Sequence, residues 1–412
     1  MIASLFVVFF CVFVVMVGYG ITLPVLPFYI ERMALVGNAT IPQAALQVGL
    51  LTAVFSLAQF IFAPLWGRWS DSVGRRPLFL VGLSGLSFSM LLFALGTNLA
   101  TLYAARTIGG ALSAATLPIA AASIADITSY EDRAQGMAWL GTATSLGVVL
   151  GPVLGAFMSK WELVKIYRVG PFRIDGFSIP FFAASLLSFL ALALAIAWFP
   201  ESRDRSHENI LTHDQSMSPS PSSNTDSALR WIGPLLALAF LNYFGLALFE
   251  GTFALHAKLL LGFGSFEMGW IFMVCGLVMA VGQSALVPPL VRHLGEPRLL
   301  AMGFMTAAGG LILLMAAQRM ASIILFVTVF ALGVALITPT LASMVSHWAH
   351  KTTGKALGQL TAANSLGQTA GPVLGGFMIS RQVHSPFLIT SLLLGLAALY
   401  ALLLIPRNGH RQ

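Results

Sequence analysis

The feature that most constrains this sequence is a succession of twelve long apolar runs. A helix of about 20 apolar residues crosses a bilayer core of about 30 Å, and most of these runs reach that length. Because lipid offers no partners to backbone amides, each run must pair its amides within its own helix. Charged residues make up only 9% of the chain, against about 25% in soluble domains. The sequence therefore predicts an all-α membrane protein with twelve transmembrane helices.

A polar segment divides the runs into two sets of six. Residues 200–230 are rich in Ser and Pro and are predicted to form a disordered cytoplasmic linker. We therefore expect one six-helix bundle over 1–199 and a second over 231–412. The first run lacks the basic flank of a signal peptide and is predicted to be a retained helix. The twelve expected spans are 3–30, 44–66, 77–97, 99–124, 134–159, 179–199, 231–257, 266–290, 299–317, 321–346, 356–380 and 384–405.

The two sets of spans resemble each other in sequence. The string Gly151-Pro152-Val153-Leu154-Gly155 recurs as Gly371-Pro372-Val373-Leu374-Gly375, 220 positions later. Gly74, after the second span, has a counterpart in Gly295, after the eighth, 221 positions later. Two landmarks at nearly one offset indicate duplication of a six-span unit. Transporters built from such repeats bind substrate between the halves, near the membrane midplane.

The distribution of Lys and Arg predicts the orientation of the chain. The net charge is +7, and 13 of the 22 basic residues fall on the side of the termini, against 8 on the other side. Basic loops favour the cytoplasm, so we expect both termini there. Residues 167–169 and 172–174, in the loop after the fifth span, flank Gly170-Pro171 and predict a short hairpin.

Several classes of function are disfavoured by what the sequence lacks. The basic residues form no stripe with interleaved aromatics, which disfavours nucleic-acid binding. The sequence has no Gly-rich phosphate loop that would bind ATP. It also has no Asp-x-x-Asp cluster that would bind Mg²⁺, and this absence disfavours a membrane-embedded transferase. Cys11 and Cys275 lie in apolar runs and predict neither a disulfide nor a metal site. We expect no cofactor, no metal, and a monomer in the lipid bilayer.

The loop after the second span reads GRWSDSVGRR, residues 67–76. Its glycines, Gly67 and Gly74, permit a tight turn between two spans. Its acid, Asp71, lies among arginines that include Arg75 and Arg76, which predicts a local ion-pair network. Simple orientation of the chain by positive charge is the alternative interpretation.

This loop resembles the signature loop of the major facilitator superfamily, Gly-x-Leu-Ser/Ala-Asp-x-x-Gly-Arg/Lys-Arg/Lys. Trp69 stands where the family has an aliphatic residue. The resemblance implies two pseudo-symmetric six-helix bundles, with the loop latching them together on the cytoplasmic side. It assigns that role to Asp71 and Arg75, and Asp126, at the end of the fourth span, is placed as their acidic partner.

Spans 1 and 5 are similar to motifs of twelve-span drug:proton antiporters within that superfamily. Gly18, Pro24 and Pro27 fit Gly-x5-Pro-Val-x-Pro, and two prolines three residues apart free carbonyls in a helix that lines a cavity. The string 147–155 fits the antiporter motif, with Gly147, Gly151, Pro152 and Gly155 in place. This resemblance implies export, although Gly-x3-Gly spacing also serves generic close packing of helices.

Two charged residues inside spans are candidates for proton coupling. Arg106 in span 4 begins a pattern similar to the Arg-x-x-x-Gly motif, which the resemblance links to proton transfer. An arginine there must face a polar cavity, pair, or snorkel to the surface. Glu250 lies well inside span 7, where a carboxyl group in low dielectric can bind and release a proton near neutral pH. Glu250 is a candidate proton or cation site, and a structural hydrogen bond or a place at the outer mouth is the alternative.

The remaining candidates are polar residues of spans 1 and 7. Asn242 lies on a face of span 7 that has Glu250 at its edge. Tyr19 lies in span 1, and Glu31 and Arg32 end that span, either as an ion pair at the outer mouth or as coupling groups. The sequence therefore predicts a proton-coupled exporter of small amphipathic molecules. The alternative is a transporter of the same fold dedicated to one solute, such as a sugar, carboxylate, siderophore or lipid-linked compound.

Overall fold

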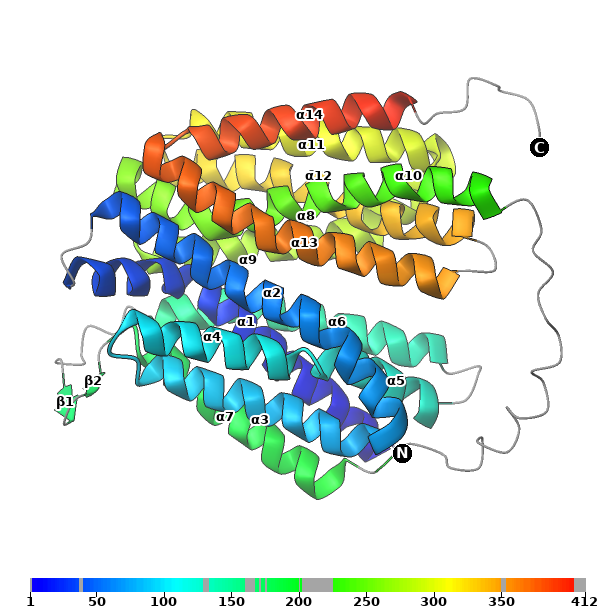
Figure 1. The fold of residues 1–412 in the computed structure, drawn as a ribbon. Coiled ribbons are helices and arrows are strands. Elements are labelled where there is room, and N and C mark those ends of the chain that lie inside the picture. Colours follow the sequence, from blue (N-terminus) through cyan, green and yellow to red (C-terminus); the bar gives the residue numbers. More distant parts are fainter. Residues whose placement is uncertain are drawn as a thin grey trace.

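The computed structural model describes residues 2–36, 40–128, 133–159, 167–169, 172–174, 176–199, 201, 225–349 and 353–403. Its helices lie side by side in two groups, one from each half of the chain (Figure 1). The N-terminal half contains α1 (Ile2–Val36), α2 (Ile41–Val73), α3 (Arg75–Ala94), α4 (Leu99–Ser113), α5 (Thr116–Ile127), α6 (Arg133–Ser159) and α7 (Ile179–Trp198). The C-terminal half contains α8 (Thr225–Leu261), α9 (Ser265–Val281), the π-helix η2 (Gly282–Leu286), α10 (Val287–Leu294), α11 (Glu296–Met315), α12 (Met320–Ala349), α13 (Thr353–Arg381) and α14 (Ser385–Leu403).

A short hairpin marks one end of the bundle. Strands β1 (Tyr167–Val169) and β2 (Phe172–Ile174) pair antiparallel, with Arg168 opposite Arg173, as the sequence predicts. The hairpin lies at the left of Figure 1, and α1 begins at the right. We call these the hairpin end and the terminus end.

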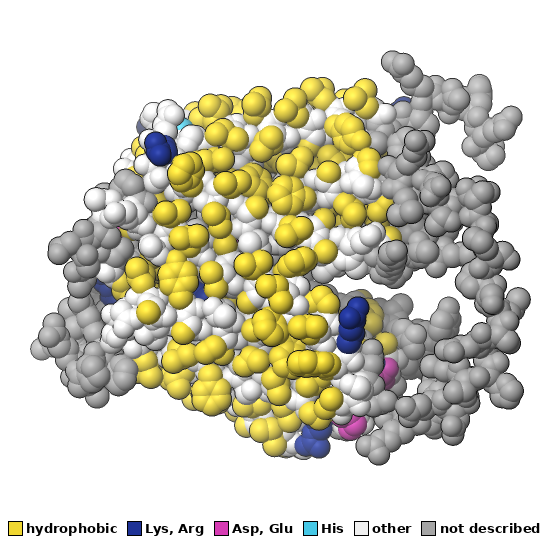
Figure 2. Space-filling view, viewed as in Figure 1, with side chains coloured by type: hydrophobic (Ala, Val, Ile, Leu, Met, Phe, Trp, Pro, Cys, Tyr) yellow, Lys and Arg dark blue, Asp and Glu magenta, His cyan; other side chains and the backbone are white. Residues whose placement is uncertain are grey.

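The described chain contains 11 segments long and apolar enough to cross a membrane. The predicted eleventh span corresponds to α13, which is long enough but less apolar than these 11. Apolar side chains cover much of the face seen in Figure 2. On the outside of the two halves, Leu186 is 74% exposed and Leu392 is 65% exposed. Such contiguous apolar exposure suits lipid rather than water, and the chain is an integral, multi-pass membrane protein.

Several predicted boundaries are wrong. The first span does not end at residue 30, because α1 continues to Val36 with Pro24 and Pro27 inside one helix. The predicted linker is helical from Thr225 onwards, where α8 begins. Its residues 202–224 lie outside the described part of the chain.

The turn after the second span is shorter than predicted. Gly67 is not part of a turn, because α2 continues through it to Val73. The turn is reduced to Gly74, with a φ of 109°, a left-handed conformation that favours glycine. Gly295 holds the matching place between α10 and α11, with a φ of 78°.

Each half has its own hydrophobic core. One core runs through α1 to α7 and includes Phe79, Phe93 and Phe181. The other runs through the C-terminal half around Phe304 and Phe330, and it also takes in Phe28 of α1. The two cores are therefore mostly separate, with α1 contributing to both.

In each half, a row of glycines spaced four residues apart, which we call a glycine ladder, allows one pair of helices to pack closely. A Cβ on Gly151 of α6 would lie 2.7 Å from the carbonyl oxygen of Val17 on α1. A Cβ on Gly371 of α13 would lie 2.5 Å from the carbonyl oxygen of Phe244 on α8. Because real side chains do not approach backbone so closely, the helices can pack this way only on glycine.

The same two motif helices also join the halves. A Cβ on Gly269 of α9 would lie 2.7 Å from the carbonyl oxygen of Pro152 on α6. Gly49 of α2 meets the carbonyl of Pro372 on α13 in the same way. Positions 49 and 269 differ by 220, as do 152 and 372. The interface between the halves therefore repeats the internal duplication as a pseudo-two-fold contact.

We predict that Gly151→Ala destabilises the protein, because the added methyl group would meet α1 backbone. Over-packing of this kind costs about 1–3 kcal/mol in free energy of unfolding. Gly141 on the same helix has nothing within 4 Å of a built Cβ, so Gly141→Ala is the matched control. It should be neutral or stabilising by up to about 1 kcal/mol. Thermal unfolding in detergent would compare them, and equal melting temperatures would contradict the ladder's role.

Candidate functional site

A hydrogen bond joins the two halves between α1 and α8. The hydroxyl group of Tyr19 on α1 donates to Oε2 of Glu250 on α8, at 2.8 Å. The two residues line a small cavity of about 30 Å³, which has room for only a few water molecules. The halves are therefore nearly in contact at this level, and a polar bond crosses between them.

Helix α8 is closely packed on both sides of Glu250 in the sequence. The neighbouring Phe249 is fully buried, and its ring lies 4.9 Å from the rings of both Phe253 and Phe330. On the other side, a Cβ on Gly251 would lie 3.1 Å from Pro372, so α13 passes close to α8 here. A carboxylate in such surroundings is costly unless it is hydrogen-bonded or protonated. Tyr19 supplies that hydrogen bond from the opposite half.

Arg106 lines the same cavity from α4. It is 5% exposed, so the snorkelling alternative is wrong. Its guanidinium carbon lies 5.0 Å from the ring centroid of Phe55 and 5.2 Å from that of Phe93, within the range of cation–π attraction. Its Nε has no hydrogen-bond partner among the described residues. Within the described chain, Arg106 therefore keeps a buried donor without a partner in this conformation, which is costly.

Local packing explains why Arg106 is placed there. A Cβ on Gly110 would lie 2.5 Å from the carbonyl oxygen of Phe55, so α4 can approach α2 only because this position is glycine. Gly109 meets the Ser89 side chain of α3 in the same way. These two glycines bring the arginine and the Phe55 ring together.

Four further polar residues line the cavity and were not predicted. They are Thr22, Thr52, Ser56 and Gln368. Gln368 lies in the glycine ladder of α13, between Gly367 and Gly371. A polar residue within an otherwise small and apolar packing motif could have identified it as a cavity residue from the sequence.

Asn242 does not line this cavity. Its Nδ2 donates to Oγ1 of Thr338 on α12 at 3.1 Å, while its Oδ1 has no partner in the described part of the chain. The shared helical face predicted for Asn242 and Glu250 therefore does not bring them to one cavity.

A second polar bridge joins the halves at the hairpin end. Nζ of Lys258 on α8 lies 2.6 Å from Oε2 of Glu31 on α1. Glu31 is 4% exposed. The guanidinium of Arg32 lies 5.1 Å from the ring centroids of Tyr29 and Phe177. No local pattern links Glu31 to Lys258 in the other half, because Lys258 is 227 positions away.

The turn at Gly74 organises the terminus end of the N-terminal half. Nε of Arg75 lies 3.1 Å from Oδ2 of Asp126, the pair that the family resemblance implies. Glu201 caps α3, because its carboxylate accepts the backbone N–H groups of Arg75 and Arg76 at 2.8 and 3.2 Å. An acid suits a helix N-terminus electrostatically. The side chain of Asp71 lies outside the described residues.

The C-terminal half carries a charge-reversed copy of this arrangement. Glu296 stands 221 positions after Arg75, and His347 stands 221 positions after Asp126. Nδ1 of His347 lies 3.4 Å from Oε1 of Glu296, which also accepts a hydrogen bond from Ser343. The acid and the base have exchanged places between the repeats, while the contact between the loop and the fourth helix of each half is kept.

Comparison with known proteins places this fold and site in a family. The chain matches the family model for the Major Facilitator Superfamily over residues 8–334 and 235–412. It is 30% identical to multidrug resistance protein 2 of Bacillus subtilis, over 92% of this chain and 89% of that protein. It is 25% identical to the quinolone resistance protein NorA of Staphylococcus aureus, over 99% and 97%. The crystal structure of a D-xylose–proton symporter superposes with a TM-score of 0.77 at 16% identity, over 98% of each chain. The chain belongs to the Major Facilitator Superfamily.

Proposed function

We propose that this protein exports small amphipathic compounds in exchange for protons, by alternating access of the site between its halves. The observation that carries the proposal is the Glu250 carboxyl group, held between the halves by Tyr19 and lining one cavity with Arg106. The similarity to proteins named for multidrug and quinolone resistance supports export of diverse compounds. We further propose that the protein lies in the cytoplasmic membrane with both termini in the cytoplasm.

The proposed coupling uses one carboxyl group for two ligands. An ionised Glu250 accepts a charge-assisted hydrogen bond from Tyr19, which is stronger than a bond between neutral groups. A proton on Glu250 weakens that bond and loosens the contact between the halves. A cationic amphipathic substrate and a proton would compete for the same carboxylate, which is the requirement for exchange.

The available driving force is sufficient for such an exchange. One pH unit supplies about 1.4 kcal/mol per proton, and a potential of 100 mV adds about 2.3 kcal/mol per charge. For a neutral substrate the two together correspond to a concentration ratio of several hundred. Exchange of one proton for one monovalent cation moves no net charge, so the pH gradient alone drives it. The Arg106 charge in the same cavity would disfavour retention of a cation once Glu250 is protonated.

We predict that Glu250→Gln abolishes substrate-driven proton movement. In inside-out vesicles with an internal pH dye, lipophilic cations should release protons through the wild-type protein and not through the variant. Glu267→Gln removes a carboxyl group that caps α9 through the Gly264 N–H at 2.9 Å, outside the cavity, and should leave this exchange intact.

Intact proton release in Glu250→Gln would instead place coupling at Asp71, Glu31 or Asp126. Uptake of one polar metabolite, without proton movement for any drug, would favour the dedicated-solute alternative.

We also predict that Tyr19→Phe uncouples transport without unfolding the protein. A hydrogen bond to a charged acceptor contributes about 1.5–3 kcal/mol, so its loss should shift the balance between conformations by about 10- to 100-fold. Proton leak without substrate should rise, measured in the same vesicles.

Tyr29→Phe is the matched control on the same helix. The Tyr29 hydroxyl group donates to the Phe93 and Gly96 carbonyls within one half, at 3.0 Å each. This variant should lower thermal stability and leave the proton leak unchanged. Equal leaks in the two variants would argue against a coupling role for the bond between the halves.

A further inference from the structure

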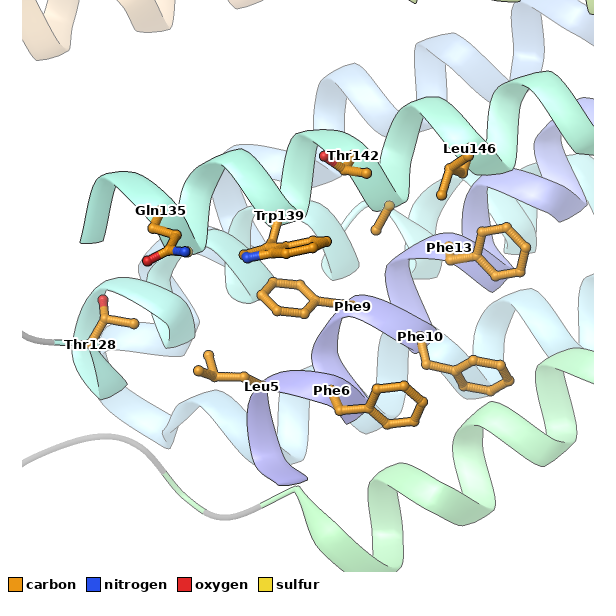
Figure 3. A pocket seen from close by; sticks show the side chains of 12 residues that line it. Leu5, Phe6, Phe9, Phe10, Phe13, Thr128, Gln135, Trp139, Thr142 and Leu146 are labelled. Carbon is orange, nitrogen blue, oxygen red and sulfur yellow. The ribbon is translucent and has the colours of Figure 1, made fainter. Parts of the chain in front are cut away.

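A second, larger hollow opens on the side of the N-terminal half. It lies between α1 and α6 at the terminus end and has a volume of about 730 Å³ (Figure 3). From α1 it is lined by Phe6, Phe9, Phe10 and Phe13, and from α6 by Trp139 and Leu146. The rings of Phe6 and Phe10 stack with their centroids 6.4 Å apart. We call this hollow the α1–α6 groove.

The groove begins where the glycine ladder of α6 stops. The ladder places Gly155, Gly151 and Gly147 against α1 at steps of four residues. One step further towards the terminus end stands Ala143, and this residue lines the groove. Where glycine is replaced by larger residues, the helices cannot keep their close approach, and a hollow remains between them.

The groove is separate from the proposed transport site. It shares no lining residue with the cavity at Glu250, and no charged side chain lines it in the described chain. A cation or anion would therefore find no counter-charge there. The walls are mostly apolar; the polar residues Thr128 and Gln135 lie on the side of the terminus end in Figure 3, and Thr142 lies further along α6.

The dimensions and exposure of the groove match one leaflet of a bilayer. From Leu5 to Phe13 the lining runs eight residues along α1, about 12 Å at 1.5 Å per residue. The hydrocarbon depth of one leaflet is about 15 Å, half of the about 30 Å core. Phe6 is 65% exposed and Trp139 is 55% exposed, so the groove is continuous with the apolar outer surface of the helices.

We propose that the α1–α6 groove binds an acyl chain of a phospholipid from the leaflet at the terminus end. In the orientation proposed above this is the cytoplasmic leaflet. The chain lies along the phenylalanines of α1, with its ester region level with Thr128 and Gln135. The occupant fills the space beyond the glycine ladder and holds α1 against α6. The proposal depends on the membrane setting of the chain and not on its substrate or direction of transport.

Tryptophan quenching by brominated lipids tests this proposal, because Trp139 is part of the groove wall. The full-length protein is reconstituted in mixtures of long-chain brominated and short-chain unbrominated phosphatidylcholine, and in the converse mixtures. The difference between wild type and Trp139→Phe isolates the Trp139 signal. Trp198, 58% exposed at the last residue of α7 and at the same end of the bundle, supplies the control through Trp198→Phe.

A groove that binds a chain should select for its length, whereas lipid around the protein exchanges freely. We expect Trp139 quenching to show a several-fold preference for the long chain, and Trp198 quenching to follow the bulk lipid composition. Thr142→Phe, at an exposed position of the groove, should remove the preference at Trp139 while substrate-driven proton release continues.

Two results would overturn the proposal. The first is the same quenching curve for Trp139 and Trp198, which would mean ordinary surrounding lipid. The second is displacement of the brominated chain from Trp139 by tetraphenylphosphonium at concentrations that drive proton release, which would make the groove a substrate site. Loss of transport in Glu250→Gln leaves the quenching result unaffected, so failures of the two proposals are distinguishable.

Discussion

A carboxyl group between two apolar helix bundles needs a partner, because its charge is costly away from water. Glu250 has its partner in the other half of the molecule, where Tyr19 donates to it. The cavity around them has room for only a few water molecules, so separation of the halves, as proposed, would exchange this bond for other contacts. In the proposed mechanism, a proton on the carboxyl group would weaken this contact between the halves. Arg106 lines the same cavity, and its buried Nε has no hydrogen-bond partner among the described residues.

The glycine motifs make such a movement compatible with rigid halves. Within each half, one glycine ladder locks a helix pair by backbone contact, α6 on α1 and α13 on α8. Between the halves, the same motif helices meet Gly269 and Gly49 through their proline carbonyls. Close-packed contacts of this kind are bistable rather than elastic. The duplicated sequence thus yields two stiff units that meet along matched small-residue faces, with polar bridges at Glu250 and at Glu31.

The sequence predicted the parts of this account that local patterns carry. Apolar runs indicated the helices, and single charges inside those runs indicated Arg106 and Glu250. The partners could not be predicted, because Tyr19 and Glu250 are 231 positions apart and nothing local links them. Glu201 was missed because it begins a stretch whose composition predicted disorder, although its carboxylate caps α3. Gly67 was misassigned because glycine permits a turn without requiring one, and here the helix continues through it.

The central claim is that substrate and proton compete for one carboxyl group. Infrared difference spectroscopy of the purified protein, before and after addition of tetraphenylphosphonium, observes that group directly. The account predicts that substrate binding removes a protonated-carboxyl band from the wild-type spectrum, and that Glu250→Gln lacks this change. A protonated-carboxyl band that substrate leaves unchanged in the wild type, or the same loss in Glu250→Gln, would contradict it.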